Sequence, residues 1–218
     1  MNKFISILSL LAIVLQSCQA QTPELPENAP AKTGETKDPR YTVTEKSFGL
    51  VKLTDNYQQV VAKYGSENVI DQELDQFESG NIVTATIVNK GKRDEFIIYW
   101  DSLHERITSI EATNPESPFR DEFGIGVGTT LEELVQINGK PITCNGFLWE
   151  FGGLITSFNQ GKLKGPAENR TVSYWLELKE DNEPNMAIIG EGEFRSDVPE
   201  MKKSLKTIVV NNIGISKL

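Results

Sequence analysis

Apolar residues follow one pattern in two places along the chain: a helix with a single apolar face, closed by a glycine. The clearer copy is 123–141 (FGIGVGTTLEELVQINGKP), where a Thr-x-x-Glu start precedes apolar residues at helical spacing and Gly-Lys-Pro ends the helix. The weaker copy is 52–65 (KLTDNYQQVVAKYG). The closing glycines, Gly65 and Gly139, are 74 residues apart (139 − 65). The pattern predicts two tandem units, each a helix followed by strands.

The other apolar runs predict strands. Runs 81–88 and 95–100, separated by a turn at 89–92, read as a hairpin. Further strands are expected at 41–53, 106–113, 147–151, 154–158, 171–179, 187–194 and 206–210. A short helix is expected at 199–205, capped by Ser196 or Asp197. With one main helix in each half and strands joined by hairpins, the expected fold class is α+β, built as two tandem pseudo-repeats of a helix and antiparallel strands.

The N-terminus has the features of a secretory signal. Residues 1–17 hold one positive charge, Lys3, and an apolar run that is shorter than the ~20 residues a membrane-spanning helix needs. Leu15-Gln16-Ser17-Cys18 resembles the lipobox of bacterial lipoproteins, an aliphatic residue and a small residue before a cysteine. The resemblance implies cleavage before Cys18 and lipid attachment at this residue. An ordinary signal peptide, cut within 17–20, is the alternative.

The rest of the chain divides into a tether and two repeats. Residues 18–40 carry the lipidated cysteine and a stretch rich in Pro, Thr, Glu and Lys, which has too little apolar surface to fold and is expected to be disordered. The first repeat is expected at 41–113 and the second at 114–218. Because Gln19 rather than Asp follows the cysteine, similarity to sorted lipoproteins implies an outer-membrane anchor with the domain facing the periplasm.

Composition excludes several functions. A net charge of −9 disfavours nucleic acid, and it equally disfavours charge-driven docking on anionic lipids. The chain has a single histidine, His104, so a His-rich zinc site cannot form, and we expect no Ser-His-Asp triad. His104 is expected in a solvated turn, and Cys144 as a small buried hydrophobe. We expect no cofactor, no metal and no catalytic residue.

The entry to the second helix also resembles a known family. Gly126-Val127-Gly128-Thr129-Thr130, together with Gly139-Lys140-Pro141, is similar to the helix signature of BamE-like and beta-lactamase-inhibitor-like envelope domains. The resemblance implies a small α+β fold of that kind. It implies little about activity, because one fold can carry many functions.

Aromatic residues on the expected strands offer the one candidate binding surface. Most of them must be core, but those sharing an exposed face would form an interface. The candidates are Trp100, Trp149, Trp175 and Tyr174. We therefore expect a non-enzymatic lipoprotein that is held to the membrane by its lipid and binds another envelope protein. The alternative is a periplasmic carboxylate-dependent hydrolase of a glycan or peptide, which needs two acids facing each other across a cleft.

Overall fold

The computed structural model describes residues 38–76, 81–164, 170–179 and 185–217. Contacts divide the chain into two units, 1–36 and 37–218, and every described residue belongs to the second. The expected signal segment, Cys18 and most of the tether therefore lie outside the described residues. No helix in the described part is long and apolar enough to cross a membrane.

Ordered structure begins before the predicted end of the tether. Pro39–Tyr41 forms a short 3-10 helix, and the Asp38 carboxylate accepts a hydrogen bond from the Arg40 backbone N–H at 2.9 Å. The Tyr41 ring then packs edge-on against Phe119. Asp38 to Arg40 thus belong to the folded unit, although the sequence placed them in a disordered tether.

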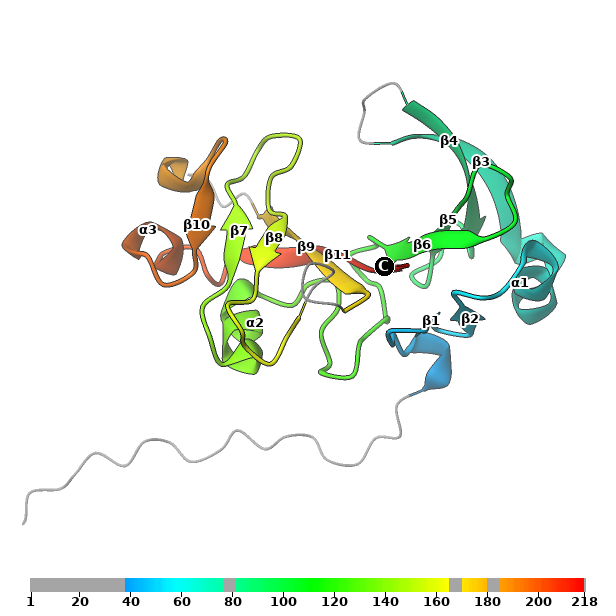
Figure 1. Ribbon diagram of the computed structural model, residues 1–218, viewed down its shortest axis with the longest axis horizontal. Helices are drawn as coiled ribbons and strands as arrows, with labels where there is room; N and C mark the ends of the chain where they lie inside the picture. Colours follow the sequence, from blue (N-terminus) through cyan, green and yellow to red (C-terminus); the bar gives the residue numbers. More distant parts are fainter. Residues whose placement is uncertain (1–37, 77–80, 165–169, 180–184, 218) are drawn as a thin grey trace, which may run out of the picture. The chain divides into compact units, whose positions relative to one another are not determined.

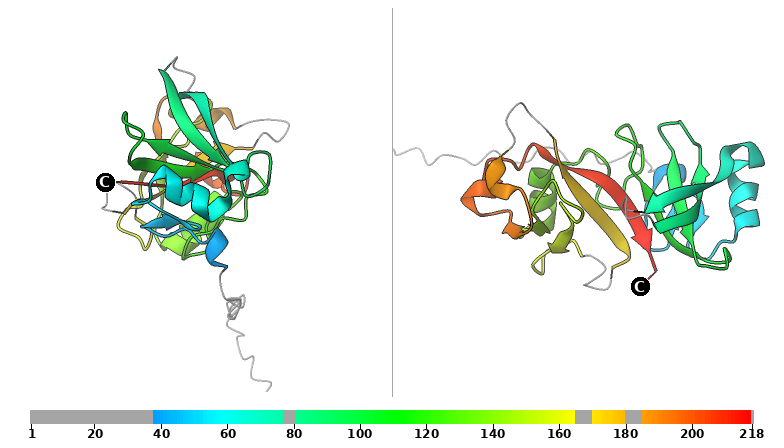
Figure 2. Two further views of the ribbon diagram at one scale, coloured as in Figure 1. Left: turned by 90° about the vertical axis from the view of Figure 1, so that its right-hand side faces the viewer. Right: turned by 90° about the horizontal axis from the view of Figure 1, so that it is seen from above.

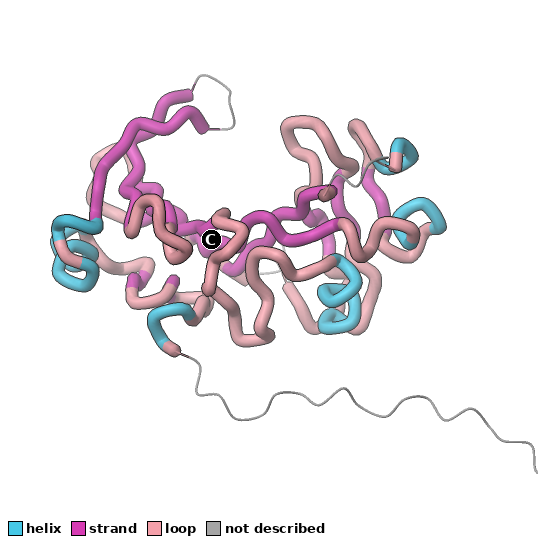
Figure 3. The backbone as a smooth tube through the Cα atoms, turned by 180° about the vertical axis from the view of Figure 1, so that it is seen from behind, coloured by secondary structure: helices cyan, strands magenta, loops and turns pink. Residues whose placement is uncertain are grey.

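The folded unit is built on one long antiparallel sheet (Figure 1). Its strand order is β3 (Val69–Gln76), β4 (Asn81–Val88), β5 (Phe96–Trp100), β6 (Ile107–Ala112), β11 (Ile208–Ser216), β9 (Val172–Leu178). A second sheet has the order β10 (Glu193–Arg195), β7 (Thr143–Asn145), β8 (Ile155–Ser157), and a small hairpin joins β1 (Ser47–Phe48) to β2 (Val51–Lys52). Strands outweigh helices (Figure 3), so the expected α+β class with antiparallel sheets is confirmed.

The two main helices form where the capping signals predict them. α1 (Tyr57–Tyr64) begins with a capping box between Asn56 and Gln59, and α2 (Leu131–Asn138) with one between Thr130 and Glu133. Each ends at a glycine with positive φ. Both helices lie on the same side of the long sheet, with the β1–β2 hairpin (Figures 1 and 2).

The core lies between the long sheet and these helices. Cross-strand pairing puts one apolar row on the helix side: Ile98, Ile110, Ile215 and Val172. All four side chains are essentially inaccessible to solvent. On the opposite side of the sheet, Tyr99 donates a hydrogen bond to Glu111 at 2.9 Å, and Asn212 donates to the same carboxylate at 2.7 Å. The sheet is therefore apolar toward the helices and more polar on the other side.

Two predicted strands are wrong. Residues 147–151 form a turn instead, because Leu148 has φ +61°, which does not fit an extended strand. The strand of this region is β7, which lies just before it. Residues 187–194 contain a 3-10 helix (Met186–Ile188) and only the short β10, because Gly190 at φ +93° interrupts the run.

Three further elements differ from the prediction. The sequence predicts no strand at β3, in which Val69 is buried but Ile70 is 44% exposed. α3 (Pro199–Lys202) is shorter than expected and is preceded by Val198, with no side-chain cap, since the Asp197 carboxylate pairs with Arg195. β11 continues six residues past its predicted end, through an irregularity between Val210 and Asn212 that absorbs the polar residue between them.

Candidate functional site

Two of the four candidate surface aromatics are buried, so the predicted surface does not form as a set. The Trp100 side chain stacks on His104 with ring centroids 4.9 Å apart, and its Nε1 donates to the Thr86 hydroxyl at 2.8 Å. Tyr174 is buried as well, and its hydroxyl donates to Asp121 at 2.5 Å. Both residues alternate onto the helix side of the sheet, where apolar area is removed from water.

The other two candidates belong to an exposed apolar surface. Trp149 and Trp175 are half-buried, and beside them Leu148 is 59% exposed, Phe151 41% and Leu154 36%. The Trp149 and Phe151 rings meet edge-on at 5.6 Å, and Leu154 forms a β-bridge with Trp175. We call these five residues the 148–154 surface. It replaces the predicted aromatic surface and shares two residues with it.

Hydrogen bonds hold the loop that carries this surface. The Trp149 indole donates to the Gly146 carbonyl at 2.9 Å, and the Asn145 amide donates to the Phe151 carbonyl at 3.0 Å. The Trp175 indole closes the loop from β9 by donating to the Gly152 carbonyl at 2.5 Å. Apolar side chains are thus presented to solvent on a backbone that is already ordered.

Leu148 adds a local cost to this arrangement. Its φ of +61° lies in the left-handed region, which a leucine rarely occupies and which costs on the order of 1–3 kcal/mol. Its side chain gains little burial in return. Retention of a strained, exposed leucine is the kind of outlier from which a functional role can be inferred.

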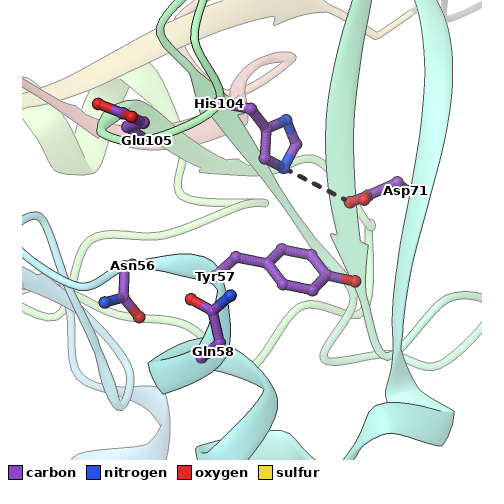
Figure 4. Close-up of a pocket in the computed structure, with 6 residues that line it drawn as sticks. All are labelled: Asn56, Tyr57, Gln58, Asp71, His104 and Glu105. Carbon is purple, nitrogen blue, oxygen red and sulfur yellow. Dashed lines mark ion pairs between the residues drawn. The ribbon is translucent and has the colours of Figure 1, made fainter.

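A second feature is a pocket between α1, β3 and the turn after β5 (Figure 4). Its volume is about 500 Å³. It is lined by Asn56, Tyr57, Gln58, Asp71, His104 and Glu105. The capped start of α1 fixes the first three, β3 supplies the fourth, and the β5–β6 turn supplies the last two. Sequence reasoning missed this pocket because it assigned no strand to β3.

His104 lies in the turn between β5 and β6, as the sequence predicted, but its ring is only partly solvated. Its side chain is one-third exposed, its backbone has φ +56°, and its ring stacks on Trp100. Nε2 lies 4.0 Å from Asp71 Oδ1 and makes no hydrogen bond within the described residues. Asp71 Oδ1 accepts instead from the Thr86 hydroxyl at 2.7 Å, which itself accepts from the Trp100 indole. A relay of three side chains therefore fixes the wall of the pocket.

The lining of the pocket is acidic and aromatic. Burial, and secondarily the negative charge of Asp71, raise the pKa of Tyr57, which therefore stays a neutral phenol. In Figure 4 the Tyr57 ring extends toward Asp71, whereas the Glu105 carboxylate points away from it. Among the described residues no group of three or more His, Cys, Asp and Glu could hold a metal. A carboxylate beside an aromatic ring, as Asp71 is beside Tyr57, suits an organic cation such as a Lys or Arg side chain.

The most buried charges belong to a structural cluster elsewhere. Asp121 is fully buried and accepts from the backbone N–H groups of Phe123 and Ile125 at 2.9 and 2.8 Å. Its second oxygen receives the Tyr174 hydroxyl and, at 3.2 Å, an Arg170 Nη2. This cluster joins the start of the second half of the chain to β9.

Cys144 is buried on β7, as the sequence predicted. Burial, with a smaller effect of Glu193, raises the pKa of its thiol from 9.0 to about 12. A buried thiol with such a pKa carries almost no thiolate at neutral pH.

Comparisons with known proteins leave the family open. No protein-family model matches the chain, and no curated protein matches it. Among solved structures, the chain is similar to an uncharacterised protein, yfeY, from Escherichia coli. The two share 17% identity with a TM-score of 0.46, and the match covers 81% of this chain and 99% of that one.

Proposed function

We propose that this chain is a lipid-anchored protein of the bacterial envelope that binds another envelope protein and catalyses no reaction. The observation that carries the binding role is the 148–154 surface, an apolar patch on an ordered loop. Lone exposed apolar residues are common, but clustered ones with aromatic neighbours are typical of interfaces.

The energetics favour binding by this surface. Fully burying a leucine or phenylalanine side chain contributes about 1.5–3 kcal/mol. Leu148, Phe151 and Leu154 keep much of that area exposed in the free protein. Because hydrogen bonds to Trp149 and Trp175 already order the loop, a partner would pay little additional conformational entropy.

The anchor is proposed from the sequence. Cys18 in its lipobox context supports lipid attachment, and Gln19 supports an outer-membrane location with the domain in the periplasm. Metabolic labelling with an alkyne analogue of palmitate should mark the protein, and Cys18→Ser should abolish the mark. An unlabelled wild-type protein would reject the anchor and leave the binding surface untouched.

Binding is tested by comparing membrane-derived complexes of two variants. Replacing Leu148, Phe151 and Leu154 together by serine should remove one partner that the wild type retains at stoichiometric yield. Replacing Leu50 and Phe123, which are 36% and 39% exposed and lie outside the 148–154 surface, by serine is the matched control. If both variants retain the same proteins as the wild type, the 148–154 surface does not bind.

The hydrolase alternative gains less support. It needs a carboxyl group whose pKa is raised so that it can donate a proton. The pKa values of Asp38, Asp101 and Asp197 are instead lowered, because side-chain or backbone N–H groups donate to these carboxylates. In the pocket, Asp71 and Glu105 do not face each other (Figure 4).

We also propose that the two halves are tandem copies of one unit. Adding 74 to the residue numbers of α1 gives the first and last residues of α2. The same offset relates the N-caps Asn56 and Thr130 and the closing glycines Gly65 and Gly139. After α1 the strands pair in chain order from β3 to β6. After α2, β7 pairs with β8, a bridge links Leu154 to β9, and β9 pairs with β11. An experimental structure whose halves fail to superpose in this order would reject the repeat.

A further inference from the structure

β3 ends the long sheet with one side unpaired. Among the described residues it pairs only with β4, over its whole length of eight residues. Asn89 N–H donates to the Asn68 carbonyl, so Asn68 and Asn89, the pair just before β3, are a hydrogen-bonded pair of the antiparallel ladder. Hydrogen-bonded pairs recur at every second residue from there. Alternation then directs the backbone N–H and C=O of Asp71 and Glu73 away from β4, toward the open edge.

The side chains along this edge alternate in chemistry. Asp71, Glu73 and Asp75 point to one face of the strand, and Ile70, Gln72 and Leu74 to the other. Across from the acidic row, β4 offers Thr86, Thr84 and Ile82, none of them basic. Asp71 and Glu73 therefore face no basic side chain on the neighbouring strand.

The pocket beside His104 lies at one end of this row. A strand added to β3 would place the side chain opposite Asp71 on the same face as Asp71, which is the face that lines the pocket. The pocket there offers the Asp71 carboxylate, the Tyr57 ring and a His104 Nε2 that no described residue bonds. At about 500 Å³ it has room for a long basic side chain.

We propose that β3 accepts an extended segment of a partner protein as an added strand, and that this segment carries Lys or Arg at alternate positions. Backbone pairing at the open edge supplies the register, and the acidic row selects the basic side chains. One of these side chains fills the pocket at Asp71. The interface is separate from the 148–154 surface and does not depend on the proposed lipid anchor.

Charge also decides against a second copy of this chain as the occupant. Pairing β3 with β3 of another molecule would bring two acidic rows together on one face, and like charges across a strand pair are destabilising. The same charges that protect the edge from self-association leave it open to a basic strand.

A short peptide alternating Lys with Val and Thr, blocked at both ends, is the probe. Titrated against the full chain in detergent at about 0.15 M salt, it should bind saturably. A peptide of identical composition with its lysines grouped at one end should bind at least tenfold more weakly. Equal binding of the two peptides, or no binding, would overturn the proposal, because the first result indicates charge attraction alone.

Two variants of Glu73 separate the contribution of backbone hydrogen bonding to peptide binding from the contribution of side-chain charge. Glu73→Gln and Glu73→Pro both remove the acid, but only proline removes the outward N–H while leaving the β4 ladder intact. Glu73→Gln should weaken binding up to about fivefold, and Glu73→Pro at least tenfold beyond that. Equal binding by the two variants would refute strand addition.

A probe-side control covers the case in which Glu73→Pro does not fold. Alternate amides of the peptide can be N-methylated in two ways, on the odd or on the even residues. Only one of these two peptides, here called phases, has its blocked amides facing β3. One phase should abolish binding and the other should retain it. If both phases bind as the parent peptide does, the added-strand model is wrong.

Discussion

Replacing Asp121 by asparagine should destabilise the fold strongly, although the shape of the side chain hardly changes. The asparagine can still accept from the Phe123 and Ile125 N–H groups, but its NH₂ group then faces Arg170, which can only donate, and the Tyr174 hydroxyl loses its carboxylate acceptor. The buried guanidinium, whose side chain is 5% exposed, loses its buried counter-ion.

The magnitude follows from these contacts. Breaking a buried ion pair by removing one partner costs about 3–5 kcal/mol. Glu122 and Glu45 remain 3.3 and 3.9 Å from Arg170, but both are mostly exposed, so each offsets only about 0.2–1 kcal/mol. The expected loss is therefore about 3 kcal/mol, a large share of the 5–15 kcal/mol typical of a domain.

Urea unfolding of the chain without residues 1–18 measures this loss of stability. A double-mutant cycle with Arg170 tests whether the loss comes from the Asp121–Arg170 ion pair. In an Arg170→Met background, Asp121→Asn should cost at least about 1 kcal/mol less, because no buried cation remains to be stranded. A loss below about 1 kcal/mol for Asp121→Asn alone, or identical losses in both backgrounds, would refute the argument that this ion pair holds the start of the second half to β9.

Three further predictions concern other sites. Burial raises the pKa of the Cys144 thiol to about 12, so above pH 9 the thiol keeps its proton in the folded protein and loses it on unfolding. Between about pH 9 and 12 the wild type should therefore lose up to ~1.4 kcal/mol of stability per pH unit more than Cys144→Ala. Parallel pH profiles of the two proteins would contradict this. Leu148→Asn should raise the unfolding free energy by up to about 1 kcal/mol, since asparagine tolerates positive φ, and Leu103→Asn should not. Asn138→Leu should lower the free energy of unfolding, measured in urea, by about 3 kcal/mol or more. The substitution leaves the Leu163 N–H and the carbonyls of Lys140 and Phe158 without the hydrogen bonds of the Asn138 amide. A loss below about 1 kcal/mol would show that water replaces the amide.

Local signals predicted the helices and the central hairpin well. Capping residues, an apolar face and a closing glycine lie within a few positions of one another, so α1 and α2 could be located from short windows. The β4–β5 hairpin likewise follows from two apolar runs around a short polar turn.

The failures come from features that depend on distant parts of the chain. β3 is an edge strand, so it needs few buried residues, and its acidic residues resemble a loop in sequence. Trp100 and Tyr174 could not be assigned to a face of the sheet without the register of their neighbours. Residues 147–151 are apolar enough for a strand, but the positive φ of Leu148 turns the chain there and produces the exposed surface.

The most direct test of the binding role is photo-crosslinking in living cells. A photoreactive amino acid at Phe151 should give one discrete adduct with an envelope protein, and the same residue at Leu50, which is 36% exposed in the turn of the β1–β2 hairpin and belongs to neither proposed interface, should not. Adducts of equal pattern from both positions, or none from Phe151, would contradict the account, because the 148–154 surface would then meet only solvent or random neighbours.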